Sequence, residues 1–141
     1  MTAAGGTCTV IIPTLNEAST LPLLLDDLEA VTCVSGIVVS DGGSVDDTRE
    51  IALQRGATVV SGPRGRGEQL RRGAAAASGP WYVFLHADSR LGPAAGDALD
   101  RFVETASSDR FANFGLVFDA SGAVYRFIEW GQRARERLFG M

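Results

Sequence analysis

Short apolar runs alternate with segments of helical character along most of the chain. The runs typical of strands are CTVII (8–12), GIVVS (36–40), ATVVS (57–61) and WYVFLH (81–86). The segments typical of helices are 19–31, 44–56, 67–79 and 92–106. Because strands that alternate with helices form parallel sheets with both faces covered, the pattern predicts a three-layer α/β/α fold around a mostly parallel sheet.

Residues that favour helix ends mark the boundaries of the predicted helices. Ser19 or Thr20 is expected to cap the first helix, with Pro22 in its first turn. The apolar face of this helix consists of Leu21, Leu24, Leu25 and Leu28. Ser44 is expected to cap the second helix, which ends at Gly56.

The pattern changes after residue 107. The stretch FANFGLVFD (111–119) predicts a fifth strand, and residues 124–139 predict an amphipathic helix. The apolar face of that helix is expected to be exposed, mobile or paired with a second copy of the chain, which makes a homo-oligomer one of the open alternatives.

Composition narrows the classes of partner. A formal net charge of −4 over 141 residues argues against nucleic acid as the main partner. Cys8 and Cys33 show neither metal-ligand spacing nor a disulfide framework, so we expect reduced thiols in a cytoplasmic protein. The first residues do not resemble a secretory signal, and no apolar run approaches the ~20 residues of a membrane span.

Polar residues follow each of the four predicted strands. They are Thr14, Asn16 and Glu17 after the first, Asp41 after the second, Arg64 and Arg66 after the third, and His86 and Asp88 after the fourth. In open parallel sheets, ligands bind beyond the carboxyl ends of the strands. The sequence therefore predicts a ligand site at this edge.

Two common nucleotide-binding motifs are absent. The first turn, PTLNEAST, lacks the glycines of a dinucleotide-binding motif, which disfavours a Rossmann oxidoreductase. The stretch GPRGRGEQ has the glycine spacing of a phosphate loop, but Glu68 and Gln69 stand where Lys and Ser or Thr are required. Arg64 and Arg66 still suit a phosphate, because they precede a helix N-terminus. The alternative is a flexible surface loop with solvated arginines.

Asp88 comes directly after an apolar run, Trp81–Leu85, that we expect to be buried on both faces. A carboxylate there costs desolvation energy unless it is paired. Asp88 could hold a divalent cation whose other ligands are a diphosphate and water. The alternatives are a cap for the helix that begins near Pro93 and a salt bridge to Arg90.

Four ordered stretches resemble the family-two glycosyltransferases of the A-type fold. They are VIIPTLNEASTLPLLL, IVVSDGGSVDDT, GRGEQLRRGAAAASG and YVFLHAD, spanning about residues 8–91. The resemblance is greatest to the branch with D-G-G-S-x-D and H-A-D motifs, and residues 111–141 resemble its next segment more loosely. It implies a nucleotide-diphospho-sugar transferase-like fold and transfer of a sugar, with inversion, from a nucleotide-sugar to an unidentified acceptor.

The same resemblance implies a site. Its nucleotide-binding residues are Pro13, Thr14, Asn16, Glu17, Asp41, Gly43, Arg66, Gln69 and His86, and its metal ligand, for Mn²⁺ or Mg²⁺, is Asp88. Asp41 would accept a hydrogen bond from the base or ribose. Asp46 matches an acid that also fits a helix cap. His86 stands where most of the larger family has the first Asp of D-x-D.

The resemblance also implies two regions in one structural domain. Residues 1–107 are expected to bind the nucleotide-sugar, and residues 108–141 to begin a truncated acceptor-side region, with the catalytic base beyond residue 141. An alternative is a truncated or inactive module that binds nucleotide without transfer. A sugar-phosphate nucleotidyltransferase is disfavoured, because PTLNEAS lacks that group's Gly-rich basic loop.

Overall fold

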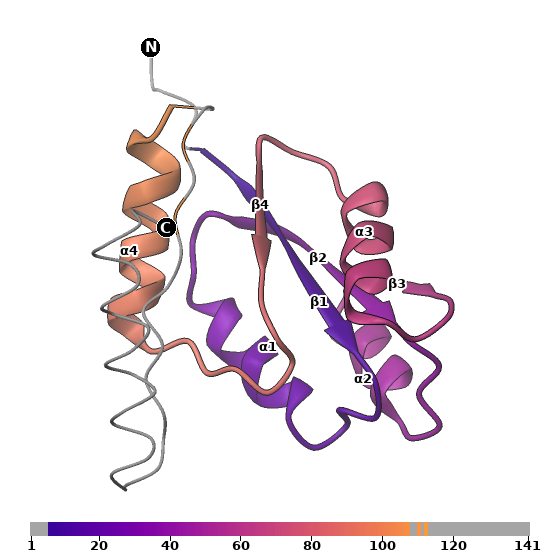
Figure 1. Ribbon diagram of the computed structural model, residues 1–141. Helices are drawn as coiled ribbons and strands as arrows, with labels where there is room; N and C mark the ends of the chain where they lie inside the picture. Colours follow the sequence, from indigo (N-terminus) through magenta and orange to yellow (C-terminus); the bar gives the residue numbers. More distant parts are fainter. Residues whose placement is uncertain (1–5, 108–109, 111, 113–141) are drawn as a thin grey trace, which may run out of the picture. The chain divides into compact units, whose positions relative to one another are not determined.

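Four parallel strands form the centre of the structure (Figure 1). The computed structural model describes residues 6–107, 110 and 112. The chain divides into two compact units, residues 1–108 and 109–141, close to the predicted regional boundary. The roles of the two regions stay predictions, and the predicted strand 111–119 and helix 124–139 lie outside the described residues.

The strands of the first unit are β1 (Cys8–Thr14), β2 (Val34–Asp41), β3 (Thr58–Ser61) and β4 (Trp81–Phe84). Their order is β3-β2-β1-β4, and each neighbouring pair is parallel. In the register, Thr14 lies opposite Asp41, and Asp41 lies opposite Ser61. The last residues of three strands therefore lie side by side.

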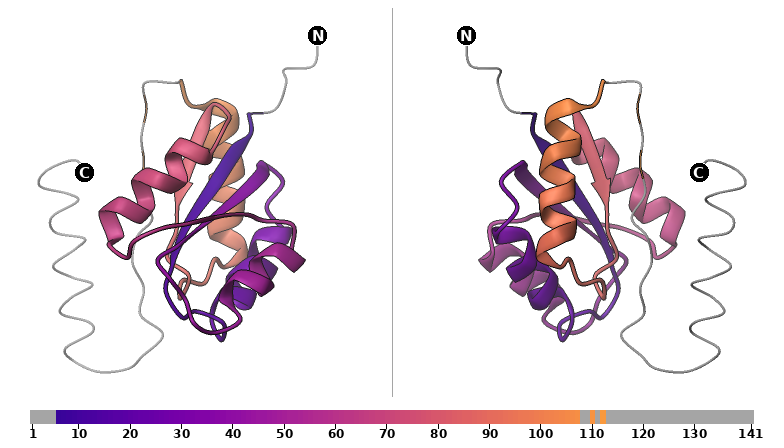
Figure 2. Two further views of the ribbon diagram at one scale, coloured as in Figure 1. Left: turned by 90° about the vertical axis from the view of Figure 1, so that its right-hand side faces the viewer. Right: turned by 90° about the vertical axis from the view of Figure 1, so that its left-hand side faces the viewer.

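Helices cover both faces of the sheet, which confirms the predicted three-layer fold. The helices are α1 (Leu21–Glu29), α2 (Thr48–Gln54), α3 (Arg66–Ala76) and α4 (Pro93–Thr105). Figure 2 shows α3 on one side of the sheet and α1, α2 and α4 on the other. None of the helices in this part of the chain is long and apolar enough to cross a bilayer.

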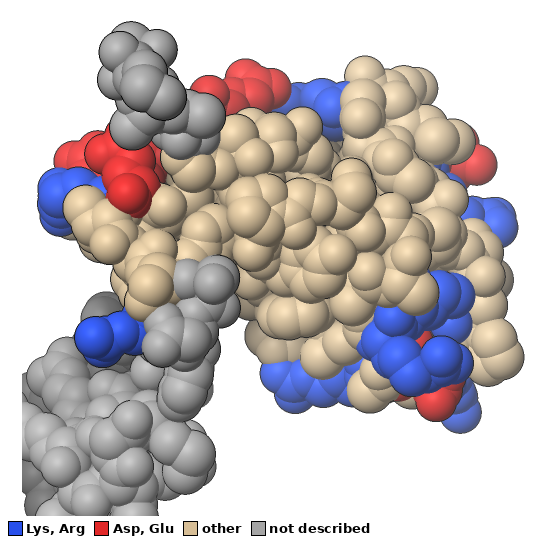
Figure 3. All heavy atoms as spheres, turned by 90° about the horizontal axis from the view of Figure 1, so that it is seen from above, with Lys and Arg blue, Asp and Glu red and all other residues tan. Residues whose placement is uncertain are grey.

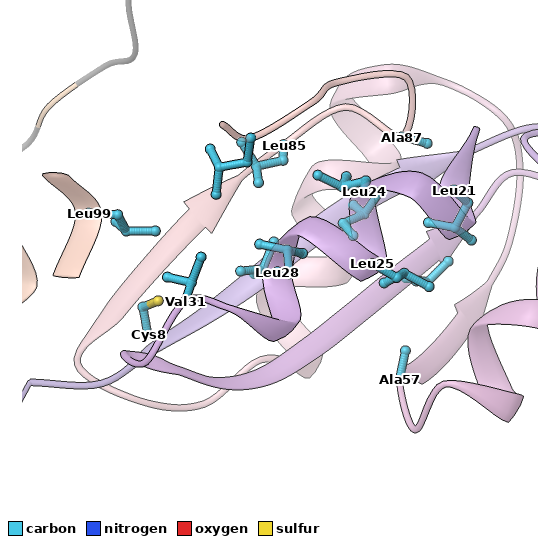
Figure 4. Packing of buried hydrophobic residues seen from close by; sticks show 14 of the residues in the cluster. Cys8, Leu21, Leu24, Leu25, Leu28, Val31, Ala57, Leu85, Ala87 and Leu99 are labelled. Atoms are coloured by element: carbon cyan, nitrogen blue, oxygen red, sulfur yellow. The ribbon is translucent and has the colours of Figure 1, made fainter. Parts of the chain in front are cut away.

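The main core lies between the sheet and α1. All four leucines of the predicted apolar face of α1 are buried. Figure 4 shows them clustered with Val31, Leu85 and Leu99, the last of these from α4. Burying a leucine contributes about 1.5–3 kcal/mol, so this face alone is enough to hold α1 in place.

The predicted start of the second helix is wrong. α2 begins at Thr48, and Ser44 does not cap it. Instead, the Ser44 hydroxyl donates to Asp41 and accepts the N–H of Asn16. The N-cap of α2 is Asp47, which makes no side-chain capping bond, and Oδ1 of the preceding Asp46 accepts the N–H of Thr48 at 3.1 Å. Several short polar residues compete for the cap in this stretch, and their tertiary contacts decide among them.

The prediction that Trp81–Leu85 is buried on both faces is also wrong. Tyr82 is 42% exposed and Phe84 is 50% exposed. Within the described residues β4 is an edge strand, and its other face carries Trp81, which packs edge-on against Phe102 of α4. A continuous apolar run is typical of strands, but it does not tell a central strand from an edge strand.

Both cysteines are free and buried, as expected of reduced thiols. Their sulfur atoms are 3.6 Å apart, between the start of β1 and the residue that precedes β2. Burial raises the pKa of both thiols, of Cys33 most strongly, so both remain protonated at neutral pH.

Gly73 allows α3 to pack closely on the sheet. A Cβ atom on Gly73 would lie 2.5 Å from Cγ2 of Ile11. We expect Gly73→Ala to lower the free energy of unfolding by about 1–3 kcal/mol, despite the helix preference of alanine, because the strand cannot give way. Urea denaturation would measure the change. Gly67 provides the control in the same helix, because its Cβ would meet nothing within 4 Å and Gly67→Ala should cost nothing. Equal losses for both variants would contradict the packing argument.

Candidate functional site

The carboxyl ends of all four strands lie at one edge of the sheet, because the strands are parallel. The predicted residues Asn16, Asp41, Arg66 and Asp88 each follow a different strand, so the structure brings them to this edge. Figure 3 shows the unit from the opposite end, where charged side chains lie around the margin and uncharged residues fill the centre. The carboxyl edge is the end at which these four candidate residues meet.

Asp41 is the centre of a buried hydrogen-bond network. Its side chain is fully buried, and Oδ2 accepts the N–H groups of Gly43 and Ser44, each at 2.9 Å. Oδ1 accepts the hydroxyls of Ser44 and of Thr14, the latter at 3.2 Å. Burial raises the pKa of Asp41, but the hydrogen bonds from Ser44, Gly43 and Thr14 outweigh it and hold the pKa below its usual value.

These contacts bear on the role expected of Asp41. Each of the two carboxylate oxygens already accepts two hydrogen bonds from the chain itself. The direct bond from Asp41 to a base or ribose stays a prediction. The geometry favours a different role, in which Asp41 shapes the turn that begins at Gly42.

A second set of hydrogen bonds ties the loop after β1 to the loop after β2. Asn16 has a positive φ of 57°, and its Oδ1 accepts the N–H of Val45 at 2.9 Å. The N–H of Glu17 donates to Thr48 Oγ1 at 2.8 Å, and the N–H of Ala18 donates to Asp46 Oδ2 at 3.1 Å. The two loops therefore form one surface.

Gly43 lies exposed on this surface. Its φ of 98° is in the region that glycine adopts without strain, and a Cβ atom there would meet nothing within 4 Å. Thr14, by contrast, is buried, with 1% of its surface exposed. Asn16 and Gly43 are thus exposed on the two loops, whereas Thr14 and Asp41 are buried.

Gln69 joins the end of the sheet to the loop that precedes α3. Its side chain is buried, and Nε2 donates to the carbonyl oxygens of Thr14 and Ser40 at 2.8 and 2.9 Å. Its Oε1 accepts the N–H of Gly65 at 3.1 Å. Gln69 therefore lies beneath the predicted nucleotide site and not on its surface.

Arg66 and His86 meet at the same edge, although they follow different strands. A guanidinium nitrogen of Arg66, Nη2, contacts Nε2 of His86, and both side chains are exposed. Because arginine has only N–H groups to offer, the hydrogen bond runs from Arg66 to Nε2 of His86. Arg64 is exposed as well. Arg64 and Arg66 can therefore both donate hydrogen bonds to an anion, and so can the ring N–H of His86.

Asp88 is exposed and stands two residues beyond His86. The alternative roles considered for it do not fit. The N-cap of α4 is Gly92, without a side-chain capping bond, and Arg90 pairs with Asp27 at 2.7 Å. Asp88 itself takes part in no hydrogen bond or ion pair within the described residues.

The arrangement fits a cation that the chain shares with a ligand. No group of three or more His, Cys, Asp or Glu side chains in the described ranges is placed to hold a metal ion. Mg²⁺ commonly binds through one or two carboxylates together with substrate phosphates and water. The exposed carboxylate of Asp88, which follows the same strand as His86, meets that requirement.

Arg72 is a residue at this edge that the sequence-based prediction missed. Its Nη2 donates to the carbonyl oxygen of Asp41 at 3.0 Å, and its Nη1 donates to that of Pro63 at 3.4 Å. It therefore holds the loop after β3 against the end of β2. Its spacing offered a signal, because Gln69, Arg72 and Gly73 lie at i, i+3 and i+4, on one face of α3.

Comparisons with known proteins agree with this fold. Residues 9–140 match the family described as Glycosyl transferase family 2, and the chain belongs to that family. Over 96 residues it is 38% identical to glucosyl-3-phosphoglycerate synthase of Mycobacterium tuberculosis, covering 60% of this chain and 30% of that protein. An uncharacterized glycosyltransferase of the same organism is 33% identical over 143 residues, covering 96% and 63%.

Solved structures of the Mycobacterium tuberculosis synthase superpose on the chain. One, in complex with Mn²⁺, UDP and glucosyl-3-phosphoglycerate, has a TM-score of 0.54 and 36% identity over 62% of this chain and 36% of the other. Another, in complex with Mn²⁺ and UDP-glucose, has a TM-score of 0.54 and 38% identity over 60% and 34%. The chain spans about a third of the length of the synthase.

These findings confirm two of the predictions made from the sequence. The chain belongs to glycosyltransferase family 2, and its fold is that of A-type glycosyltransferases.

Proposed function

We propose that the described unit binds the sugar donor of a glycosyltransferase and that this donor is a uridine diphosphate sugar held with Mn²⁺ or Mg²⁺. The observation that carries the proposal is the exposed Asp88 two residues beyond His86, which contacts Arg66. An unpaired carboxylate and an arginine at one sheet edge suit a diphosphate and its cation together. The UDP and Mn²⁺ complexes of the synthase support the choice of base and metal.

The two halves of the edge suit the two parts of such a donor. The open loop surface with Asn16 and Gly43 follows β1 and β2, and it suits the nucleoside. Arg66, His86 and Asp88 follow β3 and β4, and they suit the diphosphate. Pro13 and Glu17 lie at the end of β1 and in the loop behind it, where they shape the surface.

The residues at the diphosphate end have distinct tasks. Arg66 would donate its N–H groups to phosphate oxygens, and His86 would orient that guanidinium by accepting a hydrogen bond from it. Asp88 would hold the cation, which supplies positive charge to the leaving diphosphate when bound. We further propose that an acceptor hydroxyl attacks the anomeric carbon while the bond from that carbon to the diphosphate oxygen breaks, so that the configuration inverts. The nucleoside diphosphate leaves, and the hydroxyl proton passes to a base.

Calorimetric titration of the chain with UDP tests the proposal. We expect UDP to bind at least about tenfold more tightly with Mn²⁺ than with EDTA, because the cation bridges Asp88 and the diphosphate. Uridine, which lacks phosphate, should show no dependence on Mn²⁺. A folded chain that binds UDP equally well with Mn²⁺ and with EDTA would contradict the shared cation, and one that does not bind UDP at all would contradict the function.

A further inference from the structure

Gln69 lies where the two halves of the proposed site join. It belongs to the first turn of α3, and only 6% of its surface is exposed. One end of its side chain reaches β1 and β2, and the loops after these strands carry the surface assigned to the nucleoside. At its other end is Gly65, the residue directly before Arg66.

Every polar hydrogen and the carbonyl of the Gln69 amide are already engaged. The two N–H groups of Nε2 are matched by the carbonyls of Thr14 and Ser40, at 2.8 and 2.9 Å. The carbonyl Oε1 accepts the N–H of Gly65 at 3.1 Å. A buried amide with three such bonds has no free group with which to contact a ligand.

Gly42, in the turn after β2, packs against the side-chain amide of Gln69. A Cβ atom on Gly42 would lie 3.0 Å from Cδ, Nε2 and Oε1 of Gln69. The backbone of the turn after β2 therefore packs directly on the amide group. The amide has little freedom to turn, so the position of Gly65 is fixed relative to the strand ends.

The bond to Gly65 matters because Arg66 is the next residue along the chain. Arg66 contacts His86, which comes from the loop after β4, on the far side of β1 from β2. Gly65 itself has a φ of 148°, and no side chain of its own anchors it. Among the described residues, the side-chain amide of Gln69 thus links the start of α3 by hydrogen bonds to the ends of both β1 and β2.

We infer that Gln69 is a positioning residue, which sets Arg66 against His86 so that both can face the diphosphate, and that it does not contact the sugar donor. This inference rests on the proposed function for the identity of the ligand, but the placement of Arg66 can be tested without one. It replaces the expectation that Gln69 binds the nucleotide directly.

A double-mutant cycle tests the inference with UDP and Mn²⁺ as the probe. Gln69→Met keeps the length of the side chain and removes all three hydrogen bonds. We expect it to weaken UDP binding about tenfold, as Arg66→Ala does, and the double variant to bind no more weakly than either single variant. A loss that multiplies in the double variant would overturn the inference, because Gln69 would then act independently of Arg66. Arg71→Met is the control, since Arg71 is exposed on the same helix and pairs only with Glu68 among the described residues.

The imidazole of His86 gives a readout without ligand. The chain has 1 histidine, so its ring gives one Cε1–H signal in a proton–carbon spectrum. At fixed pH we expect Gln69→Met and Arg66→Ala to move this signal to the same new position, because both remove the guanidinium from the ring. An unmoved signal in a folded Gln69→Met variant would overturn the inference.

The two measurements separate failure of the inference from failure of the proposed function. If the wild-type chain does not bind UDP, the proposed function fails, and the His86 signal alone decides the role of Gln69. If Gln69→Met does not fold, Gln69→Glu serves in both measurements, because it keeps an acceptor for Gly65 and loses the N–H groups that reach Thr14 and Ser40. A Gln69→Glu variant with unchanged UDP affinity and an unmoved His86 signal would overturn the inference.

Discussion

Asp41→Ala is expected to lower the free energy of unfolding by about 3–5 kcal/mol. The substitution leaves two hydroxyls and two backbone N–H groups without the acceptor that they share in a buried site. An unsatisfied buried polar group costs about 1–3 kcal/mol, and relaxation of the loop limits the sum. Urea denaturation at pH 7 would measure the loss.

Asp41→Asn is the matched comparison for this loss. Its carbonyl oxygen can accept the N–H groups of Gly43 and Ser44, and its NH₂ group can donate to the hydroxyls of Thr14 and Ser44, which can reverse their roles. We therefore expect a smaller loss of about 1–2 kcal/mol. Equal losses for the alanine and asparagine variants would show that the hydrogen bonds are not the source of the effect.

The dependence of this stability on pH has a definite sign. The pKa of Asp41 is lower in the folded chain than its ordinary value, because the hydrogen bonds outweigh the effect of burial. A carboxyl group with a lowered pKa stabilises the fold above its unfolded pKa, about 3.9, and the contribution is lost as the pH falls through the folded pKa. The difference in stability between wild type and Asp41→Asn should therefore be constant near neutral pH and shrink below about pH 4.

The order of strands and helices could be predicted because it depends on local periodicity. The spacing of Leu21, Leu24, Leu25 and Leu28 determines the buried face of α1 without reference to any other segment. The edge at which Asp41 and Asp88 lie follows equally directly, since parallel strands end together. The family resemblance added an expected class of ligand, which periodicity does not encode.

The partners of the buried polar groups could not be predicted in this way. Gln69 reaches Thr14 across 55 positions of the sequence, and such a bond depends on how α3 packs on the sheet. The exposure of Tyr82 and Phe84 depends on the place of β4 at the edge of the described sheet, which an apolar run does not reveal. A residue that the sequence correctly places at the carboxyl edge of the sheet can therefore still be buried and position its neighbours instead of contacting a ligand.

Asp88→Ala is expected to abolish the gain in UDP affinity that Mn²⁺ provides. The carboxylate is exposed and forms no other bond among the described residues, so a cation shared with the diphosphate is what its removal would affect. The loss should be at least about tenfold, since even the loss of an outer-shell partner typically costs about 10–100-fold in metal affinity. Titration calorimetry with Mn²⁺ and with EDTA would measure it, and in EDTA the variant and wild type should bind UDP alike.

Two further variants make the test of Asp88 specific. Asp97→Ala removes an exposed acid from α4 and should leave the Mn²⁺ effect intact, which controls for net charge. His86→Ala should weaken UDP binding less than Asp88→Ala does, because the imidazole orients Arg66 and does not carry the negative charge that attracts the cation. The thermal midpoint of Asp88→Ala should stay close to that of wild type, because an exposed side chain without partners leaves no cavity and no unpaired group. If the Mn²⁺ effect persists in a folded Asp88→Ala chain, another group holds the cation, and the assignment of Asp88 as the metal ligand is wrong.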